Sequence, residues 1–258
     1  MTSDDSQNPL NMGPDPYAGD TFVLPKTKCT LERRLFFRRL NEITGFLYVT
    51  KFSLDECKKR YAETIIPKLP FEEKTPIKIQ LNSGNYVVMP AARLLNFTVD
   101  GVNVLTRQTL VMFYGSFETY LYQLFDRSFQ AVGITENQFD ISRDILMSRK
   151  WDGKFCKMSE VFNIGYRAND IVNHYSSFPL EFEGTKHKNP LHFLDDLAQV
   201  RHRIVHASSI LEKDKMIFID INSSHELFGF FFLLTDYIDI LFVKRFGYTR
   251  DEVNPAEA

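Results

Sequence analysis

Arg201, His202 and His206 lie close together in the segment NPLHFLDDLAQVRHRIVHASS, which also carries Asp195. An imidazole titrates near neutral pH and can take or deliver a proton, whereas an arginine can stabilise charge that builds on phosphoryl oxygens. On a helix, at about 100° per residue, the apolar residues of this segment form one arc with Arg201 near its middle. Because an unpaired buried charge is prohibitive, Arg201 must be paired or must face a second surface.

The two histidines are four residues apart, so they lie together at the edge of this arc, with Asp195 between them in angle. Arg201 and His206 are about 140° apart on the helix and do not share one face. They can still line one groove if a second surface closes it. Two copies of the helix that meet about a two-fold axis would supply that surface.

An arginine followed after four to six residues by a histidine, on the penultimate helix of a four-helix unit, resembles the signature of HEPN domains. Here four residues separate Arg201 from His206, and a polar residue, His202, directly follows the arginine as is common in that family. The earlier segment SFETYLYQLF, which contains Glu118, is similar to the family's opening helix. The resemblance covers residues 100–248, roughly, and leaves the preceding part of the chain outside it.

The resemblance implies a metal-independent endoribonuclease, active as a homodimer with a composite site, that cleaves RNA through attack of the 2′-hydroxyl. In that site His206 would be the general acid or base and Arg201 would stabilise the phosphate. His202 would orient the reacting groups or add a second polar group, with Glu118 and Asp195 as supporting residues. Neither a metal ion nor a cofactor is implied, and the 2′-hydroxyl is the group that separates RNA from DNA.

The family also suggests a setting in stress response, toxin action or antiviral defence, with an antitoxin or regulatory protein as a partner. In a subset of HEPN toxins a tyrosine, modified by a partner nucleotidyltransferase, lies two residues after the histidine. Here that position is Ser208. The difference puts that particular antitoxin pairing in doubt, but it does not affect the expected nuclease chemistry.

Several alternatives remain open from the residues alone. Arg167 and His174, in RANDIVNH, form a second arginine–histidine match. Arg201 could be a structural ion pair with Glu118 or a neighbouring loop, and His206 could be an ordinary helix histidine. The chain could then be a catalytically silent HEPN-like module that dimerises and binds nucleotide or protein, or a structural helical subunit of a larger assembly.

Two basic clusters with interleaved aromatic residues are further candidates for RNA contact, since this mixture suits backbone contact and base stacking. One consists of Arg33, Arg34, Arg38 and Arg39, with Phe36 and Phe37 between them. The other consists of Arg143, Arg149, Lys150, Lys154 and Lys157, with Trp151 and Phe155. From the second cluster we predict Arg149, Lys150 and Lys154 to bind RNA. The alternative for either cluster is a solvated helix face.

Composition limits how such a site can be built. The chain has 258 residues, of which 44% are hydrophobic, enough for one large domain or a compact domain with a smaller companion. Its net charge is −2, so nucleic-acid contact requires a local basic patch. The three cysteines are widely spaced and indicate neither a disulfide framework nor a zinc site.

Two segments bear on secretion and membranes. Residues 1–24 are polar and acidic, lack the basic and apolar regions of a signal peptide, and predict a disordered tail. The most apolar stretch, Leu227 to Val243, is shorter than a membrane span requires and carries Asp236 and Asp239. We expect it to form a buried or subunit-interface helix in a cytoplasmic protein.

The hydrophobic periodicity predicts a mainly α fold. We expect a HEPN-like helical bundle over residues 101–248, a small α/β region with a β-hairpin over residues 25–100, and a flexible C-terminus over residues 249–258. Helices are expected at 30–43, from Ser53 to before Pro67, at 102–132, 166–175, 190–208 and 224–245, with a short strand at 215–221. Alternating apolar residues near 77–81 and 86–89 predict the hairpin. The aromatic stripes at 113–125 and 228–242 are expected to form core.

Overall fold

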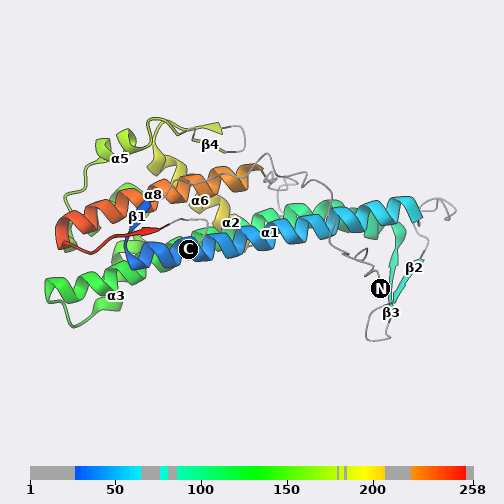
Figure 1. The fold of residues 1–258 in the computed structure, drawn as a ribbon, viewed down its shortest axis with the longest axis horizontal. Coiled ribbons are helices and arrows are strands. Elements are labelled where there is room, and N and C mark those ends of the chain that lie inside the picture. Colours follow the sequence, from blue (N-terminus) through cyan, green and yellow to red (C-terminus); the bar gives the residue numbers. More distant parts are fainter. Residues whose placement is uncertain are drawn as a thin grey trace, which may run out of the picture.

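The structure is a computed structural model that describes residues 27–64, 76–80, 86–178, 180–182, 185–206 and 222–253. It is mainly helical, as predicted. Two long helices, α1 (Leu31–Thr64) and α2 (Ala91–Val132), run side by side along the molecule (Figure 1). Their far ends extend beyond the other helices and carry strands β2 (Pro76–Gln80) and β3 (Tyr86–Pro90). These strands pair in antiparallel fashion, which confirms the predicted hairpin.

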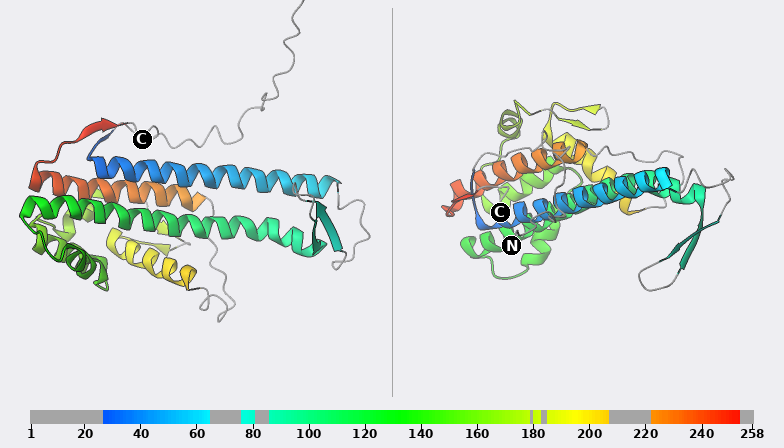
Figure 2. Two further views of the ribbon diagram at one scale, coloured as in Figure 1. Left: turned by 90° about the horizontal axis from the view of Figure 1, so that it is seen from below. Right: turned by 45° about the vertical axis from the view of Figure 1, so that its right-hand side comes forward.

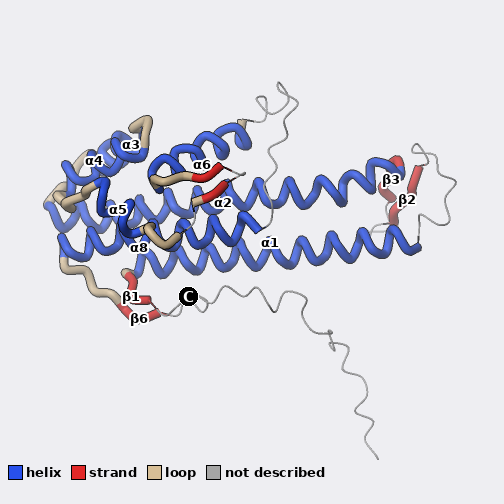
Figure 3. Tube along the Cα trace, turned by 90° about the horizontal axis from the view of Figure 1, so that it is seen from above, coloured by secondary structure: helices blue, strands red, loops and turns tan. Residues whose placement is uncertain are grey.

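The remaining helices pack against one half of this long pair and form the body of the molecule. Helix α8 (Asn222–Phe246) lies along α1 and α2 (Figure 2). On another side of α2, α6 (Pro190–Val205) packs beside α4 (Trp151–Phe162). Helices α3 (Gln138–Met147) and α5 (Ala168–His174) complete the body (Figure 3).

Two short antiparallel strand pairs lie outside the helices, one near the two ends of the chain and one in the connection between α5 and α6. Strand β1 (Thr27–Cys29) pairs with β6 (Asp251–Val253), so segments from near both ends of the chain meet beside the start of α1. Strands β4 (Glu181–Phe182) and β5 (Thr185–Lys186) form the second pair, between α5 and α6. The body is therefore closed on one side by a strand pair that joins residues far apart in sequence.

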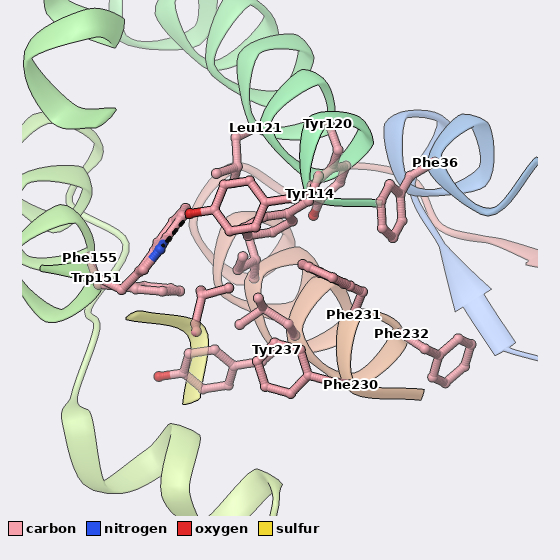
Figure 4. Packing of buried hydrophobic residues seen from close by; sticks show 14 of the residues in the cluster. Phe36, Tyr114, Tyr120, Leu121, Trp151, Phe155, Phe230, Phe231, Phe232 and Tyr237 are labelled. Carbon is pink, nitrogen blue, oxygen red and sulfur yellow. Dashed lines mark hydrogen bonds between the residues drawn. The ribbon is translucent and has the colours of Figure 1, made fainter. Parts of the chain in front are cut away.

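Aromatic rings fill the core of the body (Figure 4). The ring centroid of Phe117 lies 5.3 Å from that of Trp151 and 5.4 Å from that of Phe231. Complete burial of a side chain of this size contributes roughly 1.5–3 kcal/mol before entropy is counted. The indole N–H of Trp151 donates a 2.9 Å hydrogen bond to the Tyr114 hydroxyl, so its polar atom is satisfied inside the core. Both predicted aromatic stripes contribute to this core.

Charged side chains are buried where α8 meets the start of α1. Arg33 is fully buried and its guanidinium pairs with Asp236. Asp239, also fully buried, accepts hydrogen bonds from the hydroxyl and, at 3.2 Å, from the backbone N–H of Thr30. Arg250 lies 3.3 Å from each of the two carboxylates. Two cations thus balance two carboxylates, and the pairs join α1 and α8 to the segment before β6.

The predicted break between residues 43 and 53 is wrong, because α1 continues from Leu31 to Thr64. Ser53 was expected to cap a second helix. Instead its hydroxyl donates to the carbonyl of Val49, one turn earlier, at 2.8 Å. Such a bond lets a serine sit inside a helix, so the capping-box pattern here has no capping role. The predicted end of the next helix is correct: α2 stops at Val132, and Gly133 adopts a φ of 75°.

Two observations bear on the expected division of the chain. The expected boundary after residue 100 lies inside α2, and Phe36 and Phe37 of α1 belong to the same core as α8. The C-terminal segment expected to be flexible contains strand β6. The expected tail and the expected strand at 215–221 lie outside the described residues. Within the part that is described, we find no helix that combines the length and apolar character needed to span a bilayer.

Candidate functional site

A groove of about 670 Å³ opens between the start of α4 and the second half of α6. It is lined by Arg149, Lys150, Trp151, Lys154, Asp195, Ala198, Gln199, His202 and Arg203. Asp195 holds the two helices together, because its carboxylate accepts a 2.9 Å hydrogen bond from the backbone N–H of Trp151. This bond satisfies one of the N–H groups left unpaired at the start of α4, where the side chain of Lys150 makes no cap.

The groove is positively charged although the whole chain is slightly acidic. Four lining residues are cations, whereas Asp195 is the one carboxylate among the described lining residues. The predicted RNA-binding residues Arg149, Lys150 and Lys154 all lie here, beside His202. Cations gathered along a concave surface attract a phosphate backbone. The structure thus brings one predicted basic group and one predicted catalytic residue to the same place.

His206 lies beside the groove, next to His202. The ring centroids of the two histidines are 4.3 Å apart, and both side chains are exposed. Helix α6 ends here, and the backbone N–H of His206 donates to the carbonyl of His202 at 3.0 Å. The expected continuation of the helix to Ser208 lies outside the described residues. Of two neighbouring imidazoles that solvent can reach, one can take a proton from a reacting group while the other delivers a proton to the leaving group.

Arg201 faces away from the groove, toward α2. Its Nη2 atom lies 3.6 Å from Oε2 of Glu118, and its guanidinium carbon lies 5.6 Å from the ring centroid of Tyr114. The Nε atom of Arg201 is buried and has no hydrogen-bond partner. The requirement that an arginine in the apolar arc be paired is therefore met by Glu118. This ion pair is the structural alternative that the residue pattern left open.

Burial dominates the electrostatics around Glu118. Desolvation raises the pKa of its carboxyl group, and the positive charges of Arg201 and Lys154 lower it by less. Desolvation also lowers the pKa of Lys154, against the opposing effects of Glu118 and Asp195. The carboxyl pKa of Asp195 is raised by burial as well, in spite of its hydrogen bond from Trp151. Glu118 thus interacts with both the α6 arginine and a lysine of the groove, and its side chain is 32% exposed.

The raised pKa of Glu118 leads to a prediction about stability. A carboxyl group whose pKa is higher in the folded state contributes stability that is present at low pH and is lost as pH rises through the folded pKa. We therefore expect wild type to gain stability relative to Glu118→Gln as pH falls from 7 toward the ordinary glutamate range. Urea unfolding of both proteins across that range measures the difference. A difference that stays constant with pH would contradict the raised pKa.

None of the three comparisons with known proteins, by family model, by curated sequence or by solved structure, finds a match for this chain. The HEPN resemblance thus rests on the motif residues themselves. Among the described residues, no three His, Cys, Asp or Glu side chains are grouped as the ligands of a metal ion would be.

The aromatic residues of the second basic cluster cannot stack on bases as predicted. Trp151 is 1% exposed and Phe155 is fully buried, because both belong to the core. Lys154 instead lies over the Trp151 ring, 4.7 Å from its centroid. Two other members of the cluster pair with neighbouring carboxylates at 2.9 Å, Arg143 with Asp140 and Lys157 with Asp144.

The first basic cluster is not one solvent-facing surface. Arg33 is fully buried against Asp236 and cannot reach RNA, whereas Arg38 is exposed and pairs with Glu42 at 3.2 Å. The sequence could not separate these two arginines, because they lie on the same helix among the same residue types. Their difference comes from α8, which covers one side of α1.

The second arginine–histidine match lies away from the groove. Arg167 is exposed and precedes the first residue of α5. His174 is half-buried, with its Nε2 atom 3.6 Å from the carboxylate of Asp236. It therefore borders the buried ion pairs of α1 and α8, whereas His206 lies next to His202, which lines the groove.

Sequence reasoning missed Ala198, Gln199 and Arg203 of the groove and the packing of Arg201 on Tyr114. Ala198 precedes His202 by four residues, so helical spacing alone could have placed it on the same face. Tyr114 carries no such signal, because it comes from α2 and meets α6 only in the folded body.

Proposed function

We propose that the chain is a metal-independent ribonuclease of HEPN-like type, with RNA bound in the groove between α4 and α6. The observation that carries the proposal is the placement of four cations of the groove beside the His202–His206 pair. Cations hold the phosphates and imidazoles move protons, so both parts of RNA cleavage are available within one surface. The motif resemblance gives the reaction class.

Cleavage would proceed as a displacement at phosphorus. His206 takes the proton of a 2′-hydroxyl, and the oxygen attacks the adjacent phosphorus. The bond to the 5′-oxygen breaks, and that oxygen receives a proton from His202 or from an imidazole of a second copy. Arg201 would stabilise the charge on the phosphoryl oxygens. The products are a 2′,3′-cyclic phosphate and a free 5′-hydroxyl.

A homodimer is part of the proposal, since Arg201 and His206 point to different sides of α6 within one copy. The same resemblance implies activity in the cytoplasm, in stress response, toxin action or antiviral defence, under the control of an antitoxin or regulatory protein. These biological features rest on the family resemblance and on no residue of the groove.

A second candidate function is a catalytically silent module that binds RNA or nucleotide. The observation that favours it is the contact of Arg201 with Glu118 and Tyr114, which keeps the arginine out of the groove. Such a module would bind RNA through the same cations and release no cyclic phosphate.

The decisive experiment is incubation of the wild-type protein with a mixed RNA pool in EDTA. The ribonuclease proposal expects cleavage that survives EDTA and leaves 2′,3′-cyclic phosphate ends. A matching DNA pool, which lacks the 2′-hydroxyl, should stay intact. Binding of RNA without cleavage would favour the silent module, and no binding at all would contradict both.

The groove itself is tested by neutralising two exposed cations, in the double variant Arg149→Gln and Lys150→Gln. We expect RNA affinity to fall about tenfold at moderate salt. The slope of log affinity against log salt concentration should become shallower by about 0.7 for each phosphate that the variant no longer neutralises. The matched control is the double variant Arg143→Gln and Lys157→Gln, which removes two cations of the same cluster that do not line the groove. Equal effects in both proteins would indicate general charge attraction and not a groove site.

A further inference from the structure

Glu118 does not line the groove, but its carboxylate interacts with two cations from different helices. Arg201 of α6 is 3.6 Å from its carboxylate, and the charges of Arg201 and Lys154 both act on its pKa. Lys154 lines the groove. One carboxylate of α2 is therefore shared between a cation of the groove and the arginine that the proposed reaction requires.

The backbone of Arg201 is close to the groove although its guanidinium is not. Ala198 and His202, three residues before and one residue after it, both line the groove. The guanidinium lies on the other side, over the ring of Tyr114, whose hydroxyl is held by Trp151. An arginine side chain is long and rotates about several bonds, so it can reach the groove once its contact with Glu118 is released.

The contact between Arg201 and Glu118 is loose for a half-buried pair. It consists of one long approach of 3.6 Å and lacks the two parallel hydrogen bonds of a bidentate arginine–carboxylate pair. Nε of Arg201 is left without a hydrogen-bond partner. Burial raises the pKa of Glu118 by more than its two cations lower it, so the charged carboxylate is costly in this position. An RNA phosphodiester carries one negative charge, as a carboxylate does, and its two unesterified oxygens can form the bidentate pair that Glu118 does not form.

We propose that Glu118 is an electrostatic latch, which holds Arg201 out of the groove in the free protein and releases it when an RNA phosphate competes for the guanidinium. This inference rests on the proposed function, since it gives the regulation of the same groove. Glu118 acts through Arg201 and is a positioning residue. It does not touch the RNA.

The test compares RNA binding by wild type, Glu118→Gln, Arg201→Ala and the double variant at several salt concentrations. Release of the latch in Glu118→Gln should tighten binding about tenfold, the effect of one added charge-assisted hydrogen bond. The slope of log affinity against log salt concentration should also become steeper by about 0.7, as expected when one more phosphate of single-stranded RNA is neutralised. Arg201→Ala should weaken binding in the wild-type background, because it removes one phosphate contact of the bound state, and it should abolish both gains in the Glu118→Gln background.

The matched control is Glu32→Gln, which removes the same charge from another partly buried ion pair, with Arg127 at 3.1 Å. A gain of the same size in this control would assign the effect to net charge and overturn the latch. Weaker binding by Glu118→Gln would also overturn it and would make Glu118 a support that holds Arg201 in its working position. Urea unfolding of each variant separates these outcomes from loss of the fold.

The latch and the ribonuclease can fail separately. Binding to heparin is measured beside RNA binding and cleavage. Heparin is a sulfated polyanion that contains no phosphodiester, so the ribonuclease cannot cleave it. An Arg201-dependent gain on heparin without RNA cleavage by any variant would support the latch and contradict the ribonuclease. Cleavage by wild type without any gain in Glu118→Gln would do the reverse. Absence of polyanion binding in all four proteins would overturn both.

Discussion

Replacement of His206 with alanine is expected to reduce RNA cleavage at least about 100-fold, the usual loss when a general acid or base is removed. RNA binding should change little, because the four cations of the groove remain in place. His206 is exposed at the end of α6, so its removal should also leave the fold intact. Initial rates of cleavage and equilibrium binding, measured on the same RNA in EDTA, give the two quantities.

The control for His206→Ala is His192→Ala, an exposed histidine on the same helix that does not line the groove. It should retain full cleavage. Arg201→Ala, measured together with Glu118→Gln so that no carboxylate is left unpaired, should lose cleavage to a similar extent as His206→Ala. Unchanged cleavage in both site variants would show that the assignment is wrong, and Arg167 with His174 would be the next pair to test.

Arg33→Ala is expected to destabilise the protein by about 3–5 kcal/mol, the usual cost of removing one member of a buried ion pair. Arg33 is fully buried, and its guanidinium also lies 4.8 Å from the ring centroid of Phe37. Its loss leaves a cavity and two carboxylates with one cation fewer. Because the free energy of unfolding of a whole domain is only about 5–15 kcal/mol, the variant should be marginally folded.

The matched control for Arg33→Ala is Arg38→Ala, on the same helix. Arg38 is exposed, and its pair with Glu42 spans one helical turn, so the expected loss is below about 1 kcal/mol. Urea unfolding of the three proteins measures both effects. Similar losses for the two arginines would contradict the burial of Arg33 against α8.

Features that depend on neighbouring residues could be predicted from the sequence. Helical spacing of apolar residues indicated α2, α6 and α8, and alternation with turn residues indicated the β2–β3 hairpin. A local pattern gave a wrong prediction where tertiary packing had the larger effect. Ser53 has the pattern of a helix cap, but the packing of α1 along α2 keeps the helix continuous through it.

The candidate site shows the same division. The sequence alone required a partner for Arg201, because its place in an apolar arc of α6 rules out an unpaired charge. It also placed His202 and His206 side by side, since residues four apart on a helix are neighbours. Glu118 was named as one candidate partner. The packing of α2 against α6 determines that Glu118 is the ion-pair partner of Arg201 and that the guanidinium lies over the ring of Tyr114.

Tertiary structure alone determines which of the basic residues are buried and which reach the groove. Lys154 reaches the groove and Arg33 is buried, although both lie in clusters of similar composition. The partner of Arg33 is Asp236, some two hundred residues further along the chain. Periodicity reports which face of a helix is apolar, but it carries no information on which distant helix covers that face. Burial, ion pairing and groove formation depend on that covering helix, and so only the folded chain determines them.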